Sequence, residues 1–95
     1  MVAGLGRMQF YLHECRSLKA KRKVVKAIIA RLRNNFNASV AEVGLNDVHH
    51  QAEIGFAFIG NDRQLINSKM DKLINFAEEL GLAEVMDTDM EIISL

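Results

Sequence analysis

Two periodicities alternate along this chain, and their order restricts the folds open to it. Apolar and polar residues alternate over residues 2–12, 50–60 and 83–94, as in strands with one buried face. Apolar residues recur at helical spacing over residues 17–36 and again between Asp62 and Gly81. Residues 38–45 are strand-like, but Val40 and Glu42 share a parity, which leaves their facing open. The predicted order is therefore β-α-β-β-α-β.

The residues between these segments fit the expected boundaries. Ser17 is a candidate N-cap for the first helix, and Asn37 a candidate left-handed residue at its end. Asn61 or Asp62 is expected to cap the second helix, and Gly81 to end it. The turn between the two middle strands is predicted at residues 45–47.

The periodicities also predict which side chains are buried. The strand positions expected to point inward are Met8, Phe10, Leu12, Ala52, Ile54, Phe56, Phe58, Met86, Thr88, Met90 and Ile92. The helical stripes are Leu18, Val25, Ile28, Ile29, Leu32 and Phe36, then Leu65, Ile66, Met70, Leu73, Ala77 and Leu80. The simplest way to bury both sets is an α+β, ferredoxin-like sandwich. It has a four-stranded antiparallel sheet of order 4-1-3-2 and both helices on one face.

The other face of this predicted sheet is bare, and a bare face often serves for docking. We expect it to be mostly polar with one aromatic residue, showing Arg7, Gln9, Tyr11, Glu53, Asp87, Asp89 and Glu91.

Length and composition favour a single domain over residues 1–95, because the chain contains no proline-rich or low-complexity linker. Cys15 is the single cysteine, which excludes an internal disulfide. No stretch approaches the roughly 20 apolar residues of a membrane span, and residues 1–6 are too short for a signal sequence. We therefore expect a cytoplasmic protein that does not contact a membrane.

The first predicted helix carries cations where helices normally carry acids. Residues 16–33 contain eight basic residues and no acidic one. A helix N-terminus has partial positive charge, so a cluster of cations there costs stability unless an anion compensates it. A local rule broken in this way marks a candidate functional site.

At 100° per residue, five of these cations occupy one arc beside the apolar stripe: Lys19, Arg22, Lys23, Lys26 and Arg33. The arc is a candidate phosphate or nucleic-acid footprint. Two alternatives stay open: a solvated face paired with acids of the second helix or the tail, and a contact with a protein partner. Lys21 instead projects into the apolar stripe. We expect its stem to pack and its ammonium to lie in water, or else to aim at a bound anion, so Lys21 joins the candidate phosphate-binding residues.

Several motifs resemble the YlxP-like family, a small bacterial domain of unknown function. They are residues 17–22, residues 36–43, residues 52–55 together with 60–63, and the acidic alternating tail. The resemblance implies a ferredoxin-like fold. Genes of that family often lie among bacterial translation and ribosome-maturation genes, which implies a role near RNA. The resemblance supplies no catalytic residues. This chain departs from the family pattern at His49-His50, where an aromatic residue usually precedes a polar one.

Two further clusters have a chemical and a structural interpretation. In the predicted topology His13, Cys15, His49 and His50 approach one another, and such side chains suit zinc or copper. Their spacing matches no standard site, so we expect surface histidines and no metal. The alternating Asp87, Asp89 and Glu91 are expected to be a solvated edge-strand face, with Arg7 as a cross-strand partner.

These observations favour a non-enzymatic bacterial module without a cofactor, which contacts RNA or the ribosome through the first helix. The alternative is a homo-oligomeric interaction module, most simply a homodimer. A charge asymmetry motivates it. Residues 1–37 hold nine basic residues and one acid, a net charge of +8, whereas residues 38–95 hold three basic residues and eleven acids, a net charge of −8. The other interpretation of this asymmetry is that the charges of the two halves neutralise each other within one fold.

Overall fold

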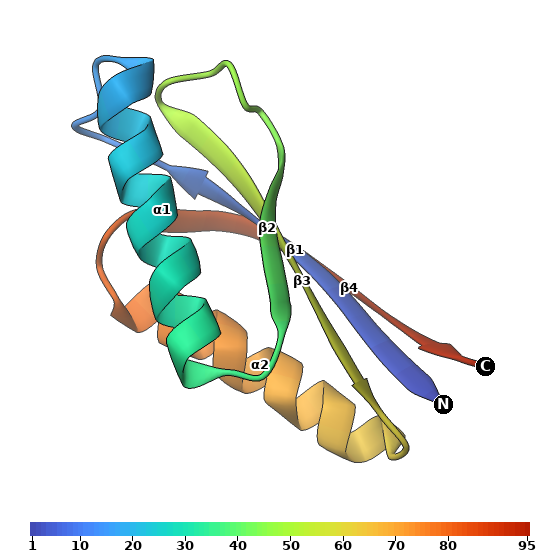
Figure 1. Ribbon diagram of the computed structural model, residues 1–95. Helices are drawn as coiled ribbons and strands as arrows, with labels where there is room; N and C mark the ends of the chain where they lie inside the picture. Colours follow the sequence, from blue (N-terminus) through green and yellow to red (C-terminus); the bar gives the residue numbers. More distant parts are fainter.

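The computed structural model describes residues 1–95 and has the predicted β-α-β-β-α-β order (Figure 1). Its elements are β1 (Val2–Tyr11), α1 (Leu18–Asn35), β2 (Ser39–Gly44), β3 (Gln51–Gly60), α2 (Arg63–Glu79) and β4 (Glu84–Ser94). All three strand pairings are antiparallel, and the sheet order is β2-β3-β1-β4, which is the predicted order counted from the other edge. The α+β, ferredoxin-like prediction is confirmed.

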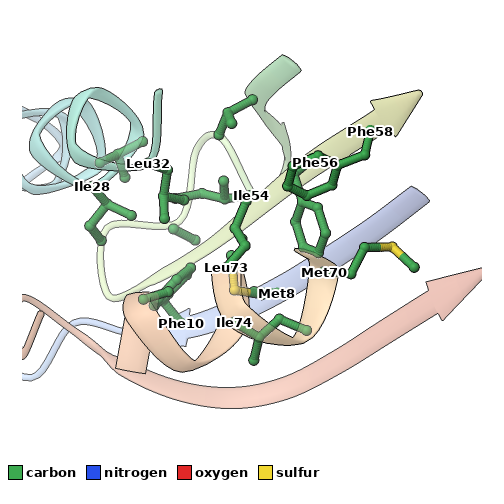
Figure 2. Close-up of a cluster of buried hydrophobic side chains, with 14 of the residues drawn as sticks. Met8, Phe10, Ile28, Leu32, Ile54, Phe56, Phe58, Met70, Leu73 and Ile74 are labelled. Atoms are coloured by element: carbon green, nitrogen blue, oxygen red, sulfur yellow. The ribbon is translucent and has the colours of Figure 1, made fainter. Parts of the chain in front are cut away.

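One core joins the sheet to both helices. Alternate residues of the central strands are buried with the apolar stripes of α1 and α2 in a single cluster, and Figure 2 shows Met8, Ile54, Ile28 and Leu73 converging there. Because these strand residues share one parity, both helices cover the same face of the sheet. Neither helix is long and apolar enough to cross a membrane.

The start of α1 is as predicted, but its end is not. The Ser17 hydroxyl oxygen accepts a hydrogen bond from the Ala20 amide at 3.1 Å, which is an N-cap. The helix ends at Asn35, and Phe36 is extended with φ −135°. The prediction that Asn37 is left-handed is wrong, because Leu45 is the only non-glycine residue with positive φ. The extended Phe36 turns its ring onto Phe58 and Phe76, so packing ends this helix.

Asp62, and not Asn61, caps α2. The Asp62 carboxylate accepts hydrogen bonds from the Gln64 amide at 2.9 Å and the Leu65 amide at 3.3 Å. Gly81 has φ +67° and ends the helix region as predicted. Most of the predicted stripe is buried, but Leu65 is exposed and Ile74 is buried in addition.

The two capping candidates are expected to differ on substitution. Asp62→Ala removes the acceptor of two helix amides and should lower the free energy of unfolding by about 1 kcal/mol. Asn61→Ala removes no such bond and should change it by a few tenths of a kcal/mol at most. Urea unfolding of both variants measures the difference. Equal losses would contradict the assignment of the cap.

The start of β4 also differs from the prediction. A bulge opposite Gln9 and Phe10 shifts the register, so that Val85 pairs with Phe10 and packs against the core. Met86 becomes the extra residue and is exposed. Thr88 and Met90 have the predicted parity but remain exposed, because they lie on the edge strand beyond the cover of the helices.

A candidate polyanion-binding surface on the first helix

The basic arc consists of Lys19, Arg22, Lys23, Lys26 and Arg33, and all five side chains are exposed. They project from one flank of α1, a continuous helix of 18 residues. At 1.5 Å per residue, the arc spans about 21 Å along the helix axis. The structure thus presents these five cations as one elongated strip.

The arc is not neutralised within the fold. The ion pairs of the chain join Arg7 to Glu53 and Asp89, His13 to Glu84, and Lys21 to Glu42. None of them includes a residue of the arc. The ion pairs with α2 or with the acidic tail, expected in the alternative interpretation, are therefore not formed.

The start of α1 adds to the positive potential. Its first turn contains no acidic residue, and Lys19 lies within it. The partial positive charge of the helix N-terminus and the neighbouring side chains act in the same direction. Anion binding would relieve their mutual repulsion.

Arg33 has a second role at the far end of the arc. Its Nη2 donates a hydrogen bond of 2.6 Å to the carbonyl oxygen of Val40 in β2. The guanidinium group retains further donors. Arg33 thereby ties α1 to the edge strand and still faces solvent.

Lys21 does not belong to this surface. Its side chain is 1% exposed, so the prediction that its ammonium lies in water is wrong. Nζ donates to the carbonyl oxygens of Leu45 and Asn46 and lies 3.2 Å from Glu42 Oε2. The buried Oε2 atom has no other partner. These contacts satisfy the ammonium inside the protein and leave it no path to an external phosphate.

The same contacts settle the facing of β2. Val40 and Glu42 both point to the helix side, where Val40 joins the core and Glu42 meets Lys21. In Figure 1 the first turns of α1 lie beside the loop that joins β2 to β3. The hydrogen bonds of the Lys21 ammonium join these two segments.

A comparison with known protein families places the chain. A family model described as "Protein of unknown function (DUF503)" matches residues 3–90.

The chain belongs to the DUF503 family.

Among curated proteins, this DUF503 chain is 28% identical over 75 residues to "Uncharacterized protein YlxP" of Bacillus subtilis (strain 168), which covers 79% of this chain and 82% of that protein. The YlxP-like resemblance is thus confirmed. Among solved structures it is similar to "De novo designed protein Foldit4", with a TM-score of 0.54, 9% identity and coverage of 100% of this chain and 99% of the other. That likeness shows the fold alone.

The histidines of this DUF503 chain gather around an aromatic ring. The ring centroid of Tyr11 lies 4.4 Å from that of His13 and 6.0 Å from that of His50, and His49 meets His50 edge-on with a centroid distance of 5.1 Å. His13 Nε2 lies 3.0 Å from a Glu84 carboxylate oxygen. No three side chains of ligand type converge as a metal site requires. Cys15 instead packs against the core.

The acidic residues of β4 lie on the open face of the sheet, and Arg7 is their cross-strand partner as predicted. Its Nε and Nη2 donate to Asp89 Oδ2 at 3.2 and 2.9 Å, and its Nη1 donates to Glu53 Oε1 at 3.2 Å. The hydrogen bond to Asp89 and the two nearby negative charges raise the pKa of Arg7. Arg7 is therefore a fixed cation, held between two carboxylates.

The open face is less polar than predicted. Leu5, Val43, Ile59 and Ile93 are all exposed. By register Ile59 and Ile93 flank Ala3, and Leu5 shares the parity of Arg7. Continuing the alternation back from Arg7 would have found Leu5. The bulge in β2, which brings Val43 over Gly55, had no signal in the sequence.

Proposed function

We propose that this protein is a non-enzymatic bacterial, cytoplasmic module that binds RNA or the ribosome through the basic arc. The observation that carries the proposal is the strip of five exposed cations without an acidic partner. The YlxP-like resemblance, with its link to translation genes, favours RNA over other polyanions.

The energy of such binding comes from counterion release. Each phosphate neutralised by a Lys or Arg side chain frees a condensed cation, and this term needs no sequence recognition. Lys19, Arg22, Lys23 and Lys26 have no competing ion pair to break. Arg33 extends the strip and remains anchored to Val40. The arc is therefore suited to backbone contacts rather than to reading bases.

A non-enzymatic role is favoured by the contacts of the chain's other charged groups. The buried Lys21–Glu42 pair connects α1 to β2, and Arg7 pairs with two acids on the open face of the sheet. In both arrangements the charged side chains are bound to each other, which favours a structural role for them over a catalytic one.

The proposal is tested by reversing four charges of the arc: Lys19→Glu, Arg22→Glu, Lys23→Glu and Lys26→Glu. For the parent protein, log affinity for single-stranded RNA should fall with log salt at a slope of roughly −3, because four phosphates contribute about −0.7 each. The quadruple variant should lose retention on RNA. It should stay folded, and the acid at position 19, in the first turn of α1, should stabilise it by a few tenths of a kcal/mol.

Lys69→Glu with Lys72→Glu provides a control for charge reversal elsewhere, since both lysines are exposed on α2 outside the arc. This variant should retain RNA. A pull-down from bacterial lysate, with and without ribonuclease, then separates RNA from protein partners. An affinity that ignores salt, or a quadruple variant that binds normally, would refute the proposal.

A further inference from the structure

The open face of the sheet has a regular pattern of large and small side chains. On the central strands, Leu5 of β1 lies opposite Ala57 of β3, and Ile59 of β3 lies opposite Ala3 of β1. These two rows each pair one projecting side chain with one shallow position. The neighbouring row differs, because Val43 covers Gly55 opposite Arg7.

This pattern is complementary to itself. A two-fold axis that runs parallel to the strands, between β1 and β3, would lay β1 of one copy over β3 of a second copy, row on row. Leu5 would then lie over Ala57 of the second copy, and Ile59 over its Ala3. We propose that the open face is the interface of a symmetric homodimer, with the two sheets packed face to face.

The charges of the two edge strands favour this axis over a perpendicular one. The same axis lays β4 of one copy over β2 of the other, because these strands are the two edges of the sheet. By register, Asp89 then lies over Ala41, and Glu91 over Ser39. The single acid of β2, Glu42, points to the helix side. An axis perpendicular to the strands would instead set acidic β4 against acidic β4, which is repulsive.

The available area is at the lower limit for a specific dimer. Four strands about 4.8 Å apart and ten residues of about 3.3 Å give roughly 600 Å² per copy. Two copies then bury about 1,200 Å², the low end of the standard range. Sheets packed in this way keep their strands within about 30° of each other. We therefore expect a reversible dimer rather than an obligate one.

This dimer is independent of the proposed RNA function. The helices cover the other face of each sheet, so the layers would be helix, sheet, sheet, helix. The basic arc of α1 stays exposed on both outer layers. Dimerisation and RNA retention can thus be tested separately.

The test is the solution mass of the full chain by light scattering, from low micromolar to several hundred micromolar. The mass should rise with concentration from that of the 10.7 kDa chain toward twice that value. Leu5→Glu should abolish the rise, because it places a charge in the interface. Leu82→Glu is the matched control, since Leu82 is also 42% exposed but belongs to the α2–β4 connection. It should dimerise normally.

A second variant and a salt series complete the test. Ala57→Leu fills the shallow position and should also weaken the dimer, with circular dichroism to confirm the fold. Added salt should leave the dimer intact, whereas pairing of the basic arc with the acidic face would dissociate. A monomer at every concentration overturns the proposal. Dimerisation unaffected by Leu5→Glu and Ala57→Leu, or dissolved by salt, does so too.

Discussion

Lys21→Ala should lower the free energy of unfolding by about 3–5 kcal/mol, the usual cost of removing one member of a buried ion pair. The substitution leaves the Glu42 carboxylate without its only partner and removes the donor to two backbone carbonyl groups of the β2–β3 loop. It also opens a space in the apolar stripe of α1. Urea unfolding followed by circular dichroism measures the loss.

A double variant separates the charge from the packing. Lys21→Met with Glu42→Leu replaces the pair by apolar side chains of similar size, and should recover most of the stability that Lys21→Ala loses. Lys23→Ala, an exposed neighbour on the same helix, should change stability by less than about 0.5 kcal/mol. A loss below about 1 kcal/mol for Lys21→Ala would mean that the ammonium reaches water.

Lys21 also shows where inference from the sequence failed. Two irregularities were visible: a lysine inside the apolar stripe of the first helix, and Glu42 on the same parity as the apolar Val40. Each breaks its own pattern, and each explains the other once the two segments are in contact. Periodicity describes one segment at a time, so it does not reveal a contact between segments 21 residues apart. A lysine and a glutamate, each misplaced in its own pattern, are a signal for a buried pair.

The fold and the basic arc were predictable for a common reason. Both follow from the local geometry of strands and helices, which assigns side chains to faces without knowledge of the partner elements. The errors lie where that geometry is interrupted. The bulge in β4 makes Val85 point to the core where Met86 was predicted, and the bulge in β2 places Val43 on the open face. The first helix ends with an extended Phe36 packed on its neighbours, where a left-handed Asn37 was predicted. The absence of acidic partners for the arc required the three-dimensional structure.

The second large effect is expected at Gly6, where the core leaves no room for a side chain. A Cβ atom at this position would lie 2.1 Å from Phe56 Cζ and 2.6 Å from both Cε atoms of the ring. The ring therefore lies directly on the backbone of β1. Phe56 is buried and packs edge-on against Phe58, so turning its ring aside would disturb that contact.

Gly6→Ala should consequently destabilise the protein by about 2–3 kcal/mol, the upper part of the range for overpacked cores. The sign is opposite to the usual gain when alanine replaces glycine within a strand. Gly60→Ala is the control, because its Cβ would approach only the end of the Ile66 side chain, with Cδ1 at 3.1 Å. It should be nearly neutral.

Combining Gly6→Ala with Phe56→Leu should cost less than the sum of the two single changes, since the smaller side chain relieves the clash. Thermal unfolding of the parent and of these variants measures the losses, at roughly 4–8 °C per kcal/mol for a domain of this size. Additive losses, or a Gly6→Ala variant as stable as the parent, would show that the ring does not lie against β1.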